Sequence, residues 1–237
     1  MTVEEKVVYN HVAARYTAAV ILWRGDKDNP TKAKELMEAA RELTGIIFRM
    51  ESVTEKIVEE RDSALLVMAE ILYRKHSQRI MAGRNDNSDV EGLKQAKNYC
   101  DVVLPYLQFG QEKQFYQELD NTLLYIDILQ FLENVTHEKF YVEAWHVHAS
   151  SAYEASKTRL QGDELGRRYT RRLLNPIISA KYMLDDLDAG EVLIPILAAS
   201  GEKTEAITMI QQAYQRRREE LKPKEEKPKR KKLFGLF

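Results

Sequence analysis

The sequence has little glycine and proline and almost no cysteine, and each shortage narrows the class of fold. Its 237 residues include 10 glycines, 6 prolines and 1 cysteine. So few turn-forming residues disfavour a fold that is made of many tight turns. The one cysteine, Cys100, excludes an intramolecular disulfide, and a single thiol of this kind fits a reducing compartment.

Long apolar runs and a strong charge of one sign are also lacking. The most apolar stretches, 18–23 and 192–199, are far shorter than the roughly 20 residues that span a bilayer. No basic start followed by an apolar region occurs in residues 1–25, so no signal peptide is expected. The net charge is −1, so an electrostatic partner has to meet a local patch. We therefore expect a cytoplasmic protein, for which peripheral membrane contact is still allowed.

Helical periodicity is what the chain has in abundance. In 3–23 the apolar residues recur at three- and four-residue steps, which places them on one face of a helix. The same pattern predicts further helices over about 33–50, 54–80, 89–107, 112–133, 137–160, 189–199 and 203–221, with one more that follows the break at 162–166. No sufficiently long run alternates β-branched with polar residues, so no sheet is predicted. The sequence thus predicts an all-α fold of stacked antiparallel helix hairpins, either an irregular bundle or a repeat array.

Turn-forming residues separate these helices. The clearest breaks lie at 25–30, where Pro30 suits the first turn of a helix, and at 83–89 and 162–166. Proline also falls inside two helical patterns, at Pro105 and Pro176, and we expect the helix to bend or end at each of them.

The composition changes after the last predicted helix and suggests three parts. Residues 1–221 form the helical domain. Residues 222–232 contain two prolines and no apolar side chain, so they cannot bury enough surface to offset their conformational entropy and are expected to act as a flexible basic linker. Residues 233–237 are apolar, and we interpret them as a docking peptide at the end of this linker.

One stretch near the end of the helical domain resembles a tetratricopeptide repeat. In 201–214, Gly201 is followed by Ala206 and Ala213 at the spacing of the second half of that repeat. Ala33, Met37 and Ala40 echo the same spacing, and Ala96, Cys100 and Val103 do so more weakly. The resemblance implies a scaffold that presents a groove to peptides or partner proteins. Several helices here are longer than those of the repeat family, and small residues at this spacing also suit any closely packed helix pair.

The sequence offers no convincing catalytic or metal site. Glu143 and His146 share a helix face, as in carboxylate-bridged di-iron bundles, but the motif does not recur. His148 lies two residues further on, so it faces another direction. Cys100 occupies an apolar helical position, where thiols are usually inert. We therefore expect no catalytic residue, no cofactor and no enzymatic activity.

A cluster of arginines is the strongest electrostatic feature of the helical domain. Arg167, Arg168, Arg171 and Arg172 recur at one- and four-residue steps and would form one edge of a helix. Such an edge could bind the phosphates of a nucleic acid or an acidic peptide. Ion pairing with the abundant surface carboxylates is the interpretation that we favour, and a nucleic-acid-binding protein remains an alternative.

The apolar tip of the chain is the most specific functional signal. The side chains of Leu233, Phe234, Leu236 and Phe237 follow a basic run, Lys229, Arg230, Lys231 and Lys232. The tip resembles the sliding-clamp-binding peptides of bacterial and phage replication proteins, although Lys232 stands where many bacterial versions carry glutamine. It also resembles the membrane-targeting ends of some bacterial division-site ATPases, and basic residues before an apolar tip suit an anionic leaflet.

Three partners could cover this tip: a pocket on another protein, an anionic membrane, or the helical domain itself. We favour the protein pocket, such as that of a sliding clamp, over the membrane. The sequence as a whole therefore predicts a non-enzymatic scaffold or adaptor. Its helical body would bind one protein partner, and its tail would dock on a second.

Overall fold

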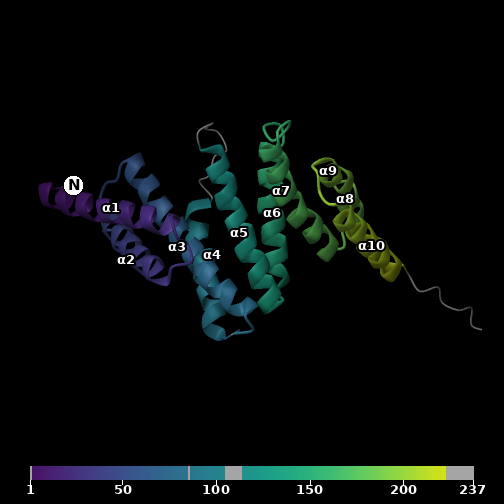
Figure 1. Cartoon of the computed structure of the whole chain (residues 1–237), viewed down its shortest axis with the longest axis horizontal. Coiled ribbons are helices and arrows are strands. Elements are labelled where there is room, and N and C mark those ends of the chain that lie inside the picture. Colours follow the sequence, from purple (N-terminus) through teal and green to yellow (C-terminus); the bar gives the residue numbers. More distant parts are fainter. Residues whose placement is uncertain (1, 85, 105–113, 223–237) are drawn as a thin grey trace, which may run out of the picture.

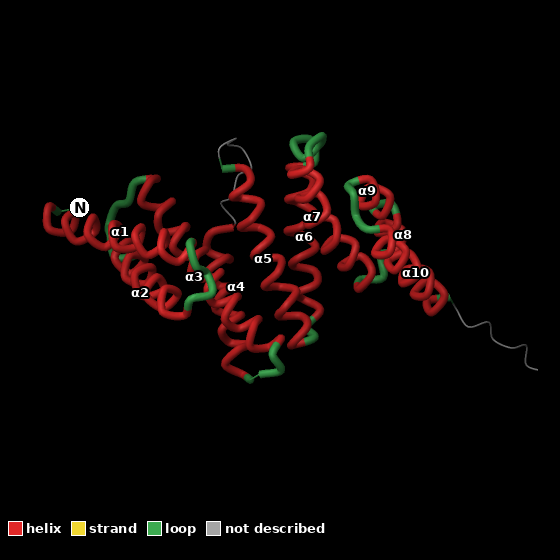
Figure 2. The backbone as a smooth tube through the Cα atoms, in the orientation of Figure 1, coloured by secondary structure: helices red, strands yellow, loops and turns green. Residues whose placement is uncertain are grey.

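The computed structural model describes residues 2–84, 86–104 and 114–222, and within these ranges the regular structure is entirely α-helical (Figure 2). The predicted all-α class is therefore confirmed. The helices are, in chain order, α1 (Val3–Arg24), α2 (Pro30–Ile47), α3 (Glu55–Met81), α4 (Asn87–Val103), α5 (Phe115–Thr136), α6 (Lys139–Ser156), α7 (Glu164–Met183), α8 (Leu187–Glu191), α9 (Ile194–Ala199) and α10 (Thr204–Leu221).

The predicted breaks become helix starts with side-chain caps. At the start of α2, the side-chain oxygen of Asn29 accepts hydrogen bonds from the backbone N–H groups of Thr31 and Lys32, at 3.1 and 3.2 Å. Pro30 occupies the first helical turn, as the sequence predicts. At the start of α4, Asp86 and Asp89 form a capping box in which each side chain accepts from the other's backbone N–H.

The helices are stacked along the long axis of the molecule in chain order, from α1 at one end to α10 at the other (Figure 1). Each helix packs against the next one along the chain, so neighbouring helices form hairpins. A second set of contacts joins α3 to α5, α5 to α7 and α7 to α9, which places these helices side by side. This arrangement of stacked neighbours is compatible with a helical repeat or a bundle.

Pro176 does not end its helix, contrary to one of the two outcomes that the sequence suggested. Helix α7 runs without interruption from Glu164 to Met183 with Pro176 inside it and buried. The proline cannot donate a helical hydrogen bond, but its own carbonyl accepts one from Nε1 of Trp145 on α6, at 3.2 Å. Helix α7 thus continues through the proline, at a position where it packs against α6.

Two other predicted boundaries also differ from the structure. The helix expected over 137–160 starts later, at Lys139, because His137 adopts a left-handed conformation (φ 57°) and terminates α5, and it ends earlier, at Ser156. The helix expected over 189–199 is split into α8 and α9, and Pro195 lies in the first turn of α9. At Pro105 we expected the helix to bend or end. Helix α4 ends at Val103, and Pro105 itself belongs to residues 105–113, which are outside the described ranges.

Polar contacts between helices supplement a continuous hydrophobic core. The hydroxyl of Tyr214 on α10 donates to the carbonyl of Ile178 on α7, at 2.5 Å. The guanidinium of Arg217 lies 2.8 Å from the carboxylate of Asp185, which follows α7. These contacts tie the last helix to the rest of the array.

Candidate functional site

A long groove follows the helices that lie side by side in the array. We call it the odd-helix groove. It has a volume of about 780 Å³ and is lined by one face of α3 between Ser63 and Met81, by α5 between Gln117 and Asp127, and by Arg168 and Arg172 of α7. On α3 the lining residues recur at three- and four-residue steps, so a single stripe of that helix faces the groove. The groove arises because α3, α5 and α7 contact one another as well as their chain neighbours.

The lining of the odd-helix groove is polar in its middle. The hydroxyl of Tyr169 and the guanidinium of Arg172 both reach Oδ1 of Asp120, at 2.9 and 3.3 Å, which fixes this carboxylate across the α5–α7 interface. The amides of Gln117 and Asn121 line the same stretch, and neither makes a side-chain hydrogen bond with the residues that the structure describes. Such amides can both donate to and accept from a peptide backbone.

At Asp127 the odd-helix groove meets a second hollow of about 410 Å³. Burial raises the pKa of the Asp127 carboxyl to about 6, although the charge of Arg172 acts in the opposite direction. Tyr73 lines both hollows and packs edge-on against Phe131, with ring centroids 5.7 Å apart. At the junction of the two hollows, the Tyr73 and Phe131 rings therefore lie near a carboxyl whose pKa is raised.

The four predicted arginines do not form one uniform cationic edge. Arg167 and Arg171 both lie beside the carboxylate of Glu164, at 3.0 and 3.2 Å. Arg171 also donates to the backbone carbonyl of Ser200, which joins α7 to the end of α9. Arg167 and Arg171 therefore stabilise helix ends, as the ion-pairing interpretation expects.

Arg168 and Arg172 instead line the odd-helix groove. Arg172 is paired with Asp120, whereas Arg168 is exposed and forms no ion pair with the described residues. Only these two members of the cluster are placed where a ligand in the groove would meet them.

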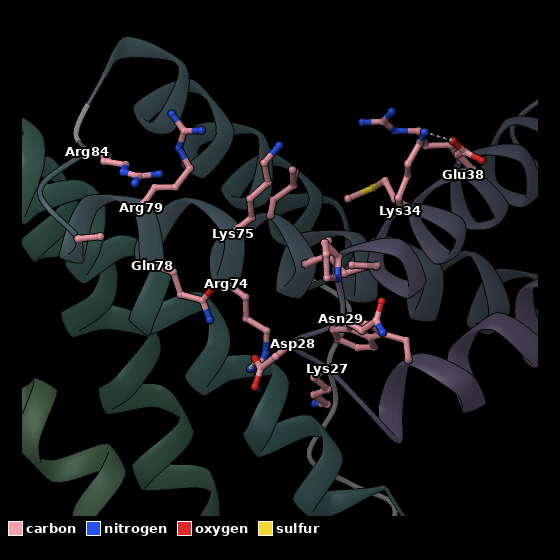
Figure 3. Close-up of a pocket in the computed structure, with 18 residues that line it drawn as sticks. Lys27, Asp28, Asn29, Lys34, Glu38, Arg74, Lys75, Gln78, Arg79 and Arg84 are labelled. Atoms are coloured by element: carbon pink, nitrogen blue, oxygen red, sulfur yellow. Dashed lines mark ion pairs between the residues drawn. The ribbon is translucent and has the colours of Figure 1, made fainter.

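A further groove, which was not predicted from the sequence, lies between α2 and α3. We call it the α2–α3 groove. It has a volume of about 860 Å³ and adjoins the odd-helix groove at Lys27, Arg74 and Gln78, which line both (Figure 3). No sequence motif marks it, because its walls come from two helices whose exposed faces meet only in the folded chain.

Cys100, His146 and His148 are buried or half-buried within helices. Burial raises the pKa of the Cys100 thiol to about 12, which keeps it protonated and unreactive. Burial lowers the pKa of His146 and of His148, and the His148 ring packs edge-on against Tyr125 at 4.8 Å. Within the described ranges, no group of three or more histidine, cysteine or acidic side chains is arranged to hold a metal ion.

The predicted tail residues, from the basic run at 229–232 to the apolar tip at 233–237, lie outside the described residues. Docking by this tip therefore stays a prediction. In the part of the chain that the structure covers, no helix combines the length and apolar character needed to cross a membrane.

Comparison with known proteins gives no relative from which a function could be transferred. No family model, no curated protein and no solved structure matches the chain.

Proposed function

We propose that the protein is a non-enzymatic scaffold whose odd-helix groove binds a segment of a partner protein. The observation that carries this proposal is the groove itself, which continues over α3, α5 and α7 and has a lining rich in amides, hydroxyls and charges of both signs. Helical arrays use extended surfaces of this kind to bind peptides. The finer resemblance of residues 201–214 to a tetratricopeptide repeat agrees with the same proposal.

The lining indicates the chemistry of the bound segment. Amides at Gln117 and Asn121 suit hydrogen bonds to a peptide backbone, while Leu66 and Leu124 offer apolar contact along the groove. Arg168, which has no ion pair in the described structure, suits an acidic side chain near one end. The favoured ligand is therefore a peptide that combines apolar residues with at least one carboxylate.

Selection from a random peptide library tests the groove without knowledge of the natural partner. We expect the full-length chain to enrich peptides that have apolar residues and a carboxylate. The double variant Asn121→Trp/Arg168→Glu fills the middle of the groove and reverses the charge at its end. It should weaken binding of the selected peptides by at least about tenfold in a fluorescence anisotropy titration.

A matched control makes the same two kinds of change outside the groove. Asn98 on α4 and Arg216 on α10 are exposed and do not line the groove, so Asn98→Trp/Arg216→Glu should bind the selected peptides as the unmodified chain does. Selected peptides that bind the groove variant and the control equally well would refute the proposal.

We further propose that the tail docks on a second protein, which makes the chain an adaptor. The support is the sequence alone: Phe234 and Phe237 flank a glycine and a leucine beyond a charged linker, a combination that suits a small hydrophobic pocket. A sliding clamp is the partner whose peptide ligands the tip resembles. An anionic membrane is the alternative, since basic residues precede the tip.

Two binding assays on the full-length protein separate these partners. If the tail enters a clamp pocket, a purified ring-shaped clamp should capture the protein, and Phe234→Ala/Phe237→Ala should reduce capture by at least about tenfold. Glu225→Ala/Glu226→Ala is the control, because it changes two residues of the same tail without touching the tip. Co-sedimentation with vesicles that contain phosphatidylglycerol, dependent on both phenylalanines and without clamp capture, would instead assign the tail to the membrane.

A further inference from the structure

The α2–α3 groove has a strong excess of positive charge. Of the described residues that line it, seven are cationic and two are acidic. The cations are Lys27, Lys34, Arg41, Arg74, Lys75, Arg79 and Arg84, and the carboxylates are Asp28 and Glu38. Because the whole chain is almost neutral, this concentration of one sign is a local property of the groove.

Some of these cations already have partners. Glu70 lies 2.7 Å from the ammonium of Lys27 and 3.1 Å from the guanidinium of Arg74. Arg79 lies 3.0 Å from Asp86 and 2.8 Å from the buried Asp89, both at the start of α4. These pairs hold one end of the groove in shape and reduce the charge that is available to a ligand there.

Other cations remain available to a ligand. Arg41, Lys75 and Arg84 are exposed and form no ion pair with the described residues. Arg84 is brought to the groove by the end of α3, where Gly83 has a left-handed conformation (φ 75°) and the N–H of Arg84 donates to the carbonyl of Arg79 at 2.9 Å. Figure 3 shows Lys75, Arg79 and Arg84 on one side of the groove and Lys34 with Glu38 across from them.

The lining beneath these charges is apolar. Trp23, Met37, Ile71 and Leu72 line the groove and are buried. The Trp23 side chain is 1% exposed, and its indole N–H has no hydrogen-bond acceptor within the described structure.

The dimensions suit a small molecule. The lining residues of α2 span 30–41, about 16 Å at the rise of an α-helix, and those of α3 span 71–79, about 12 Å, with Ala82 and Arg84 just beyond the end of that helix. The volume of about 860 Å³ falls within the range of small-molecule sites, which is roughly 300–1,000 Å³.

We propose that the α2–α3 groove binds an amphiphilic organic anion, with its apolar body on Trp23, Met37 and Leu72 and its phosphate or carboxylate beside Lys75 and Arg84. Each half of this ligand corresponds to a separate feature of the groove. An inorganic anion would leave the apolar lining uncovered, and a neutral apolar molecule would leave the cations unused. The two grooves share Lys27, Arg74 and Gln78, but Lys75 and Arg84 line only the α2–α3 groove, so variants at these two residues test this site alone.

Calorimetric titration of the full-length protein tests the proposal with four probes. Dodecyl phosphate and 1-naphthyl phosphate combine an apolar body with an anion, and they distinguish an acyl from a planar body. Inorganic phosphate and 1-naphthol each carry one of the two features. We expect saturable binding of at least one amphiphilic phosphate, at least about tenfold tighter than either single-feature probe, and weaker binding at higher salt.

The variant Lys75→Glu/Arg84→Glu removes the two unpaired cations on the α3 side without touching a buried contact. It should weaken binding of the amphiphilic phosphate by at least about tenfold. The control Lys203→Glu/Arg216→Glu makes the same charge change on exposed residues at the start of and within α10, at the other end of the array, and should bind normally (Figure 1). Equal binding by the two variants would overturn the proposal.

A nuclear magnetic resonance readout places the ligand. The chain has two tryptophans, and the conservative Trp145→Phe variant assigns their two indole N–H signals. We expect the signal of Trp23, and not that of Trp145, to shift during titration with the bound phosphate. No binding of either amphiphilic phosphate, or saturable binding that leaves the Trp23 signal unmoved, would show that this groove is not the ligand site. Displacement by an acidic amphipathic peptide that binds more tightly than both phosphates would assign the groove to a protein segment instead.

Discussion

Replacing Trp145 by alanine is expected to destabilise the protein more than any other change considered for this chain. The side chain is 2% exposed, sits between α6 and α7, and donates its indole N–H to the carbonyl of Pro176. Truncation leaves a large cavity at the α6–α7 interface and removes the hydrogen bond to the Pro176 carbonyl. The expected loss in the free energy of unfolding is about 3–5 kcal/mol, measured by urea denaturation followed by far-ultraviolet circular dichroism.

Trp145→Phe separates the cavity from the hydrogen bond. Phenylalanine fills much of the space but cannot donate to Pro176, so we expect a smaller loss, about 1–3 kcal/mol. If alanine and phenylalanine at position 145 cost the same, packing between α6 and α7 would not be the main source of stability there. Exposed Asn98→Ala on α4 provides a baseline, since surface substitutions usually change stability by less than about 0.5 kcal/mol.

Gly92→Ala is the second change with a large expected effect. Gly92 lies on α4 directly against the imidazole of His76 on α3, and a Cβ at this position would overlap the ring. The ring cannot easily move away, because its Nδ1 lies 2.8 Å from Oδ1 of the fully buried Asp89. Overpacking of this kind costs about 1–3 kcal/mol, and the backbone shift needed here places Gly92→Ala at the upper end.

Gly45→Ala is the matched control for this prediction. Gly45 is also inside a helix, α2, but nothing lies within 4 Å of the space where its Cβ would be. Here alanine should stabilise the protein by about 0.5–1 kcal/mol, because it reduces the conformational entropy of the unfolded chain. We expect the change in the free energy of unfolding to have opposite signs in the two variants. Similar unfolding midpoints for both variants would contradict this prediction.

A double variant shows whether His76 is the obstacle. In the His76→Ala background there is room for the new methyl group, so Gly92→Ala should cost much less than in the unmodified chain. The His76–Asp89 hydrogen bond also lowers the pKa of the Asp89 carboxyl. The stability that this hydrogen bond contributes is therefore present above the usual pKa of aspartate and is lost as the pH falls through the lowered pKa. Measurements at neutral pH keep this second effect constant.

These stability predictions bear on function because the same contacts position the grooves. His76, Asp89 and Arg79 join the α3–α4 hairpin beside one end of the α2–α3 groove, and Trp145 fixes α6 against α7, which contributes Arg168 to the odd-helix groove. A ligand that binds only the folded chain should in turn raise its unfolding temperature. Loss of binding in a groove variant is therefore interpretable only where the unfolding curve is unchanged.

The sequence by itself determined the class of fold and most of the helix starts. Apolar residues at three- and four-residue steps specify a helix and its buried face, as in residues 3–23, and Asn29–Pro30 and Asp86 specify where helices begin through local hydrogen bonds. It also excluded a disulfide, because there is one cysteine. All of these features depend on residues that are close together in the chain.

Tertiary structure decided what local preference could not. Pro176 lies inside α7, where its carbonyl accepts a hydrogen bond from Trp145, 31 residues away. Glu164 pairs with Arg167 and Arg171 within α7 itself, but Arg172 pairs with Asp120 on α5, a contact that only the fold provides. The grooves belong to the same category. Helical periodicity shows which face of a helix is apolar, but it does not show which exposed faces of different helices meet. Lys75 on α3 and Arg41 on α2 line one groove only because the two helices pack against each other.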